Sequence, residues 1–165
     1  MTGYDREVFD EFMSLLEIYV TDSNVKVCNY SDMMCMSRGT LFLHVSRVAG
    51  LSPMKVITDV RMNLAKHLLA LTRLNVGEIG SMVGLEDVPH FCCLFHRHND
   101  LTPSRFRNLW QSGELDTADE SLLVYELPLA DGTSVQLDLM KLAQARWNCA
   151  LAEEHYLPFD DFPWL

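Results

Sequence analysis

Apolar residues recur every three or four positions over most of the first 110 residues, a period that predicts amphipathic helices. The longest apolar stripe runs from residue 52 to residue 71. No Gly or Pro follows Pro53 within it, which predicts one unbroken helix. Shorter stripes predict six further helices. These lie at residues 5–19, 27–34, 37–48, 76–83, 87–98 and 103–110.

The second half of this helical region repeats the first at a fixed offset of 50 residues. Ser37 and Asp87 each stand where a helix would begin, and the pair Ser52 and Thr102, each followed by Pro, marks the start of the next helix. Apolar residues between these caps match as well, so we infer an internal duplication of a small helical unit. The matched pairs are Ser37/Asp87, Leu41/Phe91, Val45/Phe95, Leu51/Leu101, Ser52/Thr102 and Pro53/Pro103.

Each repeated unit, at residues 27–48 and 76–98, consists of a short helix, a turn and a second helix. This is the helix-turn-helix arrangement, whose second helix can enter the major groove of DNA. The predicted fold class is therefore mainly α, with two helix-turn-helix subdomains bridged by one long helix.

The pattern changes after the last of these helices. Residues 111–120 are polar and acidic, which is typical of a linker. Alternating residues at 122–129 and 135–139 flank Asp131-Gly132, a strong signal for a hairpin turn. Residues 141–155 then predict a helix, so the end of the chain is predicted to be a small ββα appendage.

These patterns divide the chain into three parts. We expect a double helix-turn-helix domain at 1–110, an acidic linker at 111–120 and the ββα appendage at 121–165. The appendage is too small to build much core of its own, so we expect it to pack on the helical domain or on a partner.

The net charge is −10, which at first argues against a nucleic-acid partner. The charge is unevenly placed, however. Residues 1–23 carry −5, from six acidic and one basic side chain, and residues 111–165 carry −9, from eleven acidic and two basic ones. Residues 24–110 carry ten basic against six acidic side chains, or +4, so the duplicated region is mildly basic between acidic flanks.

The sequence gives little support for a membrane protein, a secreted protein, a metal-binding protein or an enzyme. No apolar run approaches the length of a membrane span, no signal peptide begins the chain, and five cysteines suggest no disulfide framework, so a cytoplasmic protein is expected. The His and Cys residues between 90 and 98 share one helix, which supplies too few ligands for zinc. No catalytic motif is present. We therefore expect no membrane, metal or cofactor, and no enzymatic activity.

The motifs of the helical region identify a family resemblance. MSRGTL, GLSP, DVRMNLAKHLL, VGEIGSMVGLED and LTPSRFR, in this order, resemble the DNA-binding domain of AraC/XylS-type transcription regulators over residues 7–110. The residues in family register are Arg61, Ala65, Ile79, Gly84, Phe91, Phe95, Pro103 and Arg107. The resemblance implies two helix-turn-helix subdomains and double-stranded DNA as the partner.

The same resemblance implies which positions face the bases. They are Gly39, Phe42 and Leu43 in the first unit and Val88, Pro89, Cys92 and Cys93 in the second. None of these is Arg, Lys, Asn or Gln, the side chains that make paired hydrogen bonds to base edges, although Phe42 or Val88 could touch a thymine methyl group. The candidate phosphate contacts are Arg38, Arg47, His96 and Arg97. Arg61, in the linking helix, is expected to brace the subdomains instead.

Two functions remain open at this point. The first is a transcription regulator of AraC/XylS type that binds DNA through paired helix-turn-helix units. The alternative is a DNA-binding-defective relative that acts through protein contacts as an antagonist or adaptor, with the acidic C-terminus masking the basic face or imitating DNA. Residues 111–165 are also a candidate contact for a protein partner or for a homodimer.

Overall fold

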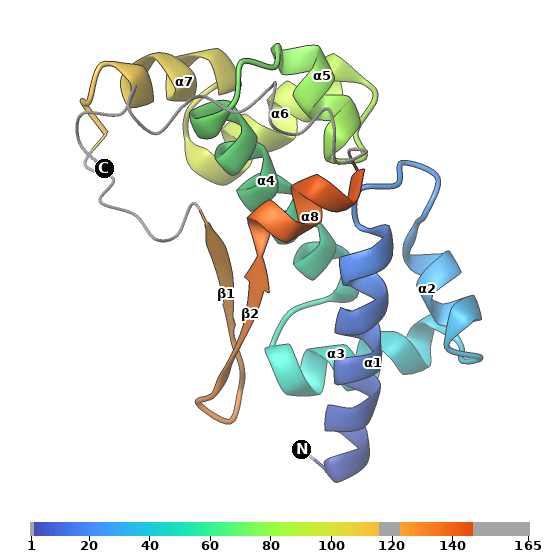
Figure 1. The fold of residues 1–165 in the computed structure, drawn as a ribbon. Coiled ribbons are helices and arrows are strands. Elements are labelled where there is room, and N and C mark those ends of the chain that lie inside the picture. The colour runs from blue at the N-terminus through green and yellow to red at the C-terminus, as the bar shows by residue number, and fades with distance from the viewer. Residues whose placement is uncertain (1, 116–122, 147–165) are drawn as a thin grey trace.

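The computed structural model describes residues 2–115 and 123–146, which form eight helices and a two-stranded sheet (Figure 1). The helices are α1 (Gly3–Tyr19), α2 (Val27–Met33), α3 (Arg38–Ala49), α4 (Pro53–Leu71), α5 (Val76–Met82), α6 (Val88–Asn99), α7 (Pro103–Gln111) and α8 (Leu139–Arg146). The strands are β1 (Val124–Pro128) and β2 (Ser134–Asp138). The mainly helical fold class is confirmed, and residues 27–110, all of them described, contain no β-strand.

The long helix α4 runs unbroken through the middle of the molecule, as its apolar stripe predicts (Figure 1). It begins where the Ser52 hydroxyl accepts a hydrogen bond from the backbone N–H of Lys55, and Pro53 occupies its first turn. α4 packs against α3 of the first unit and against α5 and α6 of the second. Buried apolar residues line it along its length: Val56, Val60, Leu64, Leu68 and Leu71.

The two helix-turn-helix units are built alike, as the repeat at 50 residues predicts. Ser37 caps α3 and Asp87 caps α6, and each side chain accepts a hydrogen bond from the backbone N–H three residues later. Both helices end on a left-handed residue, Gly50 at φ 68° and Asp100 at φ 58°. The paired apolar positions Leu41, Phe91, Val45 and Phe95 are all 0% exposed.

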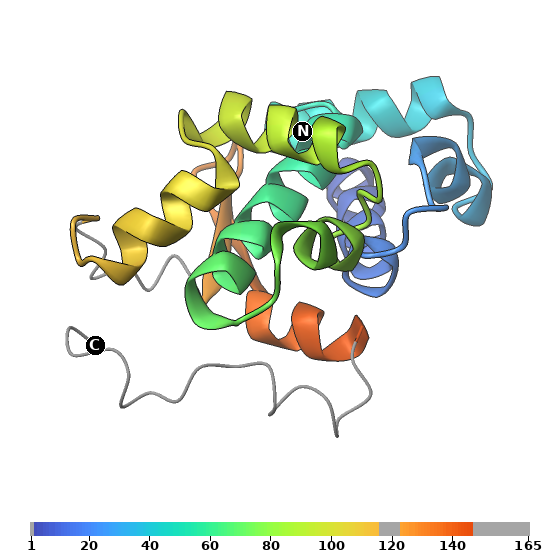
Figure 2. The ribbon, with the colours of Figure 1, turned by 90° about the horizontal axis from the view of Figure 1, so that it is seen from above.

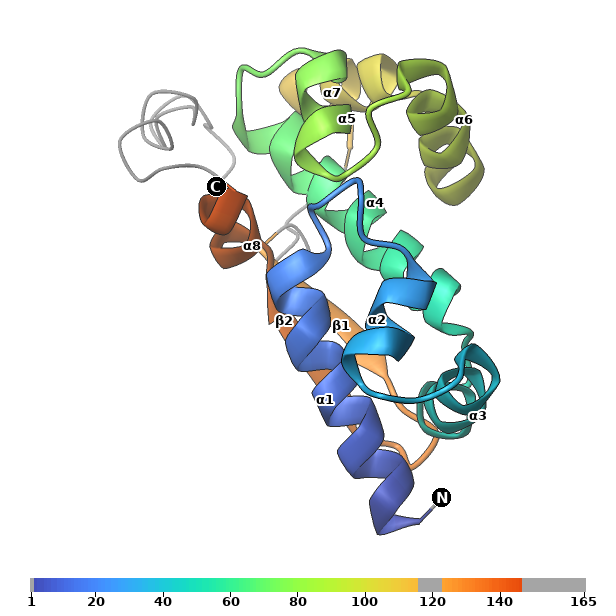
Figure 3. The same cartoon turned by 90° about the vertical axis from the view of Figure 1, so that its right-hand side faces the viewer.

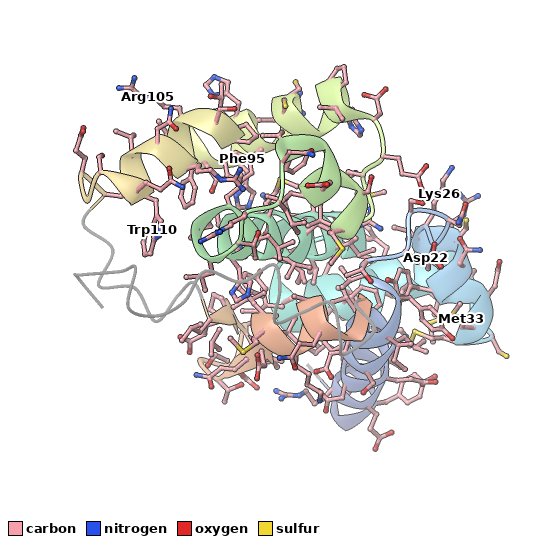
Figure 4. All side chains as sticks on the ribbon, turned by 45° about the horizontal axis from the view of Figure 1, so that its top comes forward. Asp22, Lys26, Met33, Phe95, Arg105 and Trp110 are labelled. Atoms are coloured by element: carbon pink, nitrogen blue, oxygen red, sulfur yellow. The ribbon has the colours of Figure 1, made fainter. Side chains whose placement is uncertain are left out.

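An aromatic cluster forms the core of the second unit. The ring of Phe95 lies edge-on to Phe91 and Phe106, with centroids 6.0 Å and 5.8 Å away. Figure 4 shows Phe95 pointing inward, whereas Arg105 projects from the outer side of α7. α6 and α7 are therefore held together by buried rings from both helices.

The appendage follows the predicted order, with one correction at the start of its helix. β1 and β2 pair antiparallel around a turn in which Gly132 adopts φ 83°. The helix α8 begins at Leu139, directly after β2 and two residues before the predicted start. The reason is local, because Leu139 is fully buried and the Asp138 carboxylate accepts a hydrogen bond from the backbone N–H of Lys141. The rest of that predicted helix, residues 147–155, lies outside the described residues.

The appendage packs along α4 and α1. α8 contacts both helices, and Leu127, Leu137 and Leu142 are buried with the core of the helical region. The hairpin turn reaches α3, where the backbone N–H of Ala130 donates to the carbonyl oxygen of Val48 at 2.8 Å. We expected the appendage to pack on the helical domain or on a partner, and its described part packs on the helical domain.

Tyr30, in α2, supports a prediction about alkaline stability. Its side chain is 0% exposed, its hydroxyl has no hydrogen-bond partner among the described residues, and burial raises its pKa to about 12. The unfolded chain loses this proton near pH 10 and the folded chain does not. Between pH 10 and 12 stability therefore falls, by roughly 1.4 kcal/mol per pH unit from this residue.

The Tyr30→Phe variant isolates that effect. The ring and its edge-on contact with Phe12 at 5.5 Å are kept, while the hydroxyl that titrates is removed. We expect a flatter loss of stability above pH 10 in urea titrations, with no loss at pH 7. A parallel decline in both proteins would contradict this account of Tyr30.

Candidate nucleic-acid interface

The second helices of the two units, α3 and α6, lie on the same side of α4. Seen from above, they run along one edge of the molecule and α8 lies at the opposite edge (Figure 2). The view in Figure 3 agrees, with α3 and α6 on one side of α4 and α8 on the other. One face of the molecule thus presents both candidate recognition helices.

The first recognition helix, α3, presents an apolar outer surface. Phe42 is 53% exposed and Leu43 is 45% exposed, next to exposed Gly39. Arg38 is the first residue of this helix, is exposed, and has no salt-bridge partner among the residues described. The predicted base-facing positions of the first unit are therefore all open to a ligand.

Arg47, in the last turn of α3, is engaged differently from the prediction. Its Nη1 lies 3.5 Å from the carboxylate of Asp5, which is buried at the start of α1. His44 donates from Nδ1 to the same carboxylate oxygen at 2.7 Å. Hydrogen bonds from the Thr2 backbone N–H and from His44 hold the pKa of Asp5 well below its usual range.

This Asp5 cluster ties α1 to the recognition helix. Because Asp5 is ionised over the whole neutral range, it fixes the His44 ring and draws Arg47 toward α1. Sequence reasoning counted Asp5 only in the charge of the acidic flank and gave it no structural role. Its partners lie 39 and 42 residues away, so no local pattern marks the contact.

The second recognition helix, α6, also exposes most of its predicted positions. Val88 is 38% exposed, and Cys93, His96 and Arg97 are exposed as well, whereas Cys92 is half-buried against the core. Pro89 stands exposed in the first turn.

His90, also on α6, borders a cleft between the two units. The same cleft is lined by Ile57, Arg61 and Leu94, so His90 stands where α6 faces α4. We therefore do not count His90 with the base-facing positions.

Asp59 fastens α6 to the long helix. Its carboxylate accepts hydrogen bonds from His98 Nε2 at 2.9 Å and from Lys55 Nζ at 2.7 Å. Burial raises the pKa of Asp59, but the bonds from His98 and Lys55 outweigh it and the pKa lies below the usual value. His98 thus has a structural partner and is not available to DNA.

Two arginines of the family motif, Arg61 and Arg107, donate hydrogen bonds to backbone carbonyl oxygens within the protein. Arg61 donates to the carbonyl oxygens of Val20 at 2.8 Å and Asp22 at 3.1 Å, and so braces α4 against the loop after α1. Arg107 donates to the carbonyl oxygens of Leu69 and Leu74 and holds α7 to the end of α4. Arg61 therefore has the bracing role that the sequence predicted.

Metal binding and membrane insertion are two further features that the described parts of the chain bear on. No three His, Cys, Asp or Glu side chains gather there closely enough to hold a metal ion. None of the helices described is long and apolar enough to cross a membrane.

Comparison with known proteins gives a consistent result. A family model described as a helix-turn-helix domain matches residues 30–109. The arabinose operon regulatory protein of Escherichia coli (strain K12) is 29% identical over 89 residues, which are 54% of this chain and 30% of that protein. The chain spans less than half of the length of the curated relatives that it matches, from 8% to 48%.

Two solved structures have the same fold. The C-terminal domain of the two-component response regulator yesN from Fusobacterium nucleatum is 30% identical, with a TM-score of 0.58 over 59% of this chain and 95% of that one. The DNA-binding domain of the global transcriptional factor AdpA, in complex with a target DNA, is 18% identical, with a TM-score of 0.61 over 66% of this chain and 96% of that one. At that identity the second match concerns the fold alone.

Proposed function

Because this chain belongs to the AraC/XylS family of transcription regulators, we propose that it binds double-stranded DNA through α3 and α6 and regulates transcription. We further propose that residues 1–110 form the DNA-binding domain, with the acidic linker and the ββα appendage attached to it. The chain is proposed to act without catalysis or a cofactor.

One observation carries this proposal. The outer surfaces of α3 and α6 are exposed on one face, and the unbroken helix α4 fixes their separation (Figure 3). Two recognition helices that are held rigidly on one face can enter two successive major-groove segments of the same DNA duplex.

Phosphate contacts would supply most of the affinity. Arg38 and Arg97 are exposed and have no salt-bridge partner among the residues described, so both are available. Arg47 is available only if it leaves Asp5 or shares its guanidinium with a phosphate. We propose His96 as a further polar contact, because it is exposed on the same helix as Arg97.

The alternative, in which the acidic appendage masks DNA-binding residues, receives no support from the described residues. α8 lies on the side of α4 opposite to α3 and α6 (Figure 2). The remaining part of that hypothesis falls on residues 147–165, outside the described residues. A protein partner or a homodimer through residues 111–165 stays a proposal compatible with DNA binding on the other face.

The proposal predicts weak duplex binding with a steep dependence on salt. Replacing Arg38 by Ala should weaken binding to all sequences and flatten the slope of log K against log salt by about one unit, because one phosphate contact is lost. The measurement is fluorescence anisotropy with a labelled duplex, repeated over a salt series.

Lys141→Ala is the matched control for Arg38→Ala. Lys141 is an exposed cation on α8, so its removal changes the net charge equally but leaves the recognition face intact. An equal effect of the two variants would mean that net charge alone drives binding. If the unaltered chain bound no duplex even at about 50 mM salt, the proposed function would be rejected.

A further inference from the structure

We propose that this chain selects DNA by the C5 methyl groups of thymine in the major groove, through Phe42 and Leu43 of α3 and Val88 of α6. This inference rests on the proposed function, and it names the base feature that the same site recognises. It assigns sequence preference to apolar contact instead of hydrogen bonding.

The first support is the exposure of these side chains. Phe42, Leu43 and Val88 are 53%, 45% and 38% exposed, although each is a large apolar residue on a helix with ample buried positions. Phe42 and Leu43 follow Gly39 by three and four positions, a spacing that places all three on one outward side of α3. Contiguous apolar groups on an exposed face mark a contact surface.

The second support is that the polar side chains of α3, other than Arg38 at its first position, already have partners inside the protein. The Thr40 hydroxyl bonds to the Ser37 hydroxyl at 2.8 Å. His44 donates to the buried carboxylate of Asp5, and Arg47 lies against the same carboxylate. Thr40 and His44 could read a base edge only by breaking a contact inside the protein, and Arg47 only by leaving Asp5 or sharing its guanidinium.

The free cations stand at the ends of the recognition helices. Arg38 is the first residue of α3, and Arg97 lies in the last turn of α6. Those positions suit the phosphates that flank a groove better than the bases at its floor. What remains over the bases is apolar.

The chemistry of the major groove then favours thymine. Its C5 methyl group is the one apolar group that the four base pairs present there. An apolar side chain over a G·C pair would instead cover the O6, N7 and N4 groups and leave them without partners, which is costly. Contact with a methyl favours A·T pairs, and desolvation disfavours G·C pairs.

The first experiment uses the full chain and DNA duplexes that contain only the four natural bases. Duplexes that bind are selected from a random-sequence pool, and the selected duplex is then made with uracil in place of thymine. This replacement removes the methyl groups and keeps every hydrogen-bonding group. We expect affinity to fall about fourfold for each methyl that the protein covers.

A second replacement separates methyl contact from hydrogen bonding. A contacted T·A pair is exchanged for a 5-methylcytosine·guanine pair, which keeps the methyl and changes the hydrogen-bonding groups. Binding to it should exceed binding to the same duplex with unmethylated cytosine, by a similar factor. Phe42→Ala should reduce the preference for thymine over uracil at the base pairs under α3, where Leu43 remains.

Ile18→Ala is the control variant. Ile18 is 65% exposed on α1, beside residues of β2 and α8, so exposed apolar surface is lost away from the recognition face. It should keep the preference for thymine unchanged.

The outcomes are distinct. Binding with equal affinity for thymine and uracil duplexes, or binding without any sequence preference, would overturn this inference and leave the proposed function standing. Absence of any duplex binding would reject the proposed function and this inference with it. The thymine and uracil comparison uses the unaltered chain, so a folding defect in a variant cannot decide it.

Discussion

Phe91→Ala is expected to lower the free energy of unfolding by about 3–5 kcal/mol, the range for truncating a buried Phe to Ala. The Phe91 ring is 0% exposed, contacts Phe95 edge-on, and lies against Gly80, where an added Cβ would be 3.4 Å from it. Truncation would leave a cavity between α5 and α6, because the ring fills the space that the glycine leaves open. Urea denaturation followed by circular dichroism measures the change.

Phe42→Ala is the matched control for that experiment. It removes the same atoms, but from a side chain that is 53% exposed at the middle of α3, so the expected change is about 0.5 kcal/mol or less. Similar losses for the two variants would mean that Phe91 is not part of the core. The two variants also separate the effect on stability from the effect on DNA recognition, because Phe42 is proposed to contact DNA and Phe91 packs in the core.

The helical framework was predictable because its signals are local. A capping side chain bonds to a backbone N–H three residues away, so Ser37, Ser52 and Asp87 mark helix starts within a few positions of sequence. The repetition at 50 residues then related the two units without any knowledge of contacts. The period of the hydrophobic residues and the capping residues together were sufficient to predict α4 and the helices of both units.

The site was less predictable, because it depends on contacts between distant residues. The sequence assigned Arg47 to phosphate and counted Asp5 only in the charge of the acidic flank, yet Arg47 lies 3.5 Å from the buried Asp5 carboxylate. Only the folded chain brings α1 beside α3, so the charge available on the recognition face differs from the charge counted along the sequence. Lys55 is a second example, because its positive charge counts toward the basic middle region but is paired with Asp59 in the folded chain.

The position of the appendage is a further tertiary feature. Its strands and helix follow from alternation and from the Asp131-Gly132 turn, but nothing in the pattern says which side of α4 the helix would cover. The opposite charges of the appendage and the middle region led to the masking hypothesis. The packing of α8 instead follows its buried side chains, Leu139 and Leu142.

Gly84→Ala is expected to destabilise the second unit by roughly 1–3 kcal/mol from backbone strain, and by more where atoms collide. Gly84 adopts φ 78°, in the left-handed region that a residue with a Cβ rarely adopts. An added Cβ would lie 3.0 Å from Arg61 Nη2 and 3.2 Å from the carbonyl oxygen of Thr21. The variant should therefore also disturb the bonds by which Arg61 braces α4.

The first unit allows the reverse substitution, in which a residue with a side chain at positive φ is replaced by glycine. Cys35 stands in the turn between α2 and α3, where Gly84 stands between α5 and α6, and it already adopts φ 52°. Cys35→Gly should relieve roughly 1–2 kcal/mol of left-handed strain, offset by the roughly 0.4–1 kcal/mol by which Gly favours the unfolded chain. The expected net change is therefore between zero and about 1.6 kcal/mol of stabilisation. A thermal or urea titration that showed Cys35→Gly to be as damaging as Gly84→Ala would mean that side-chain contacts, and not the sign of φ, control these two turns.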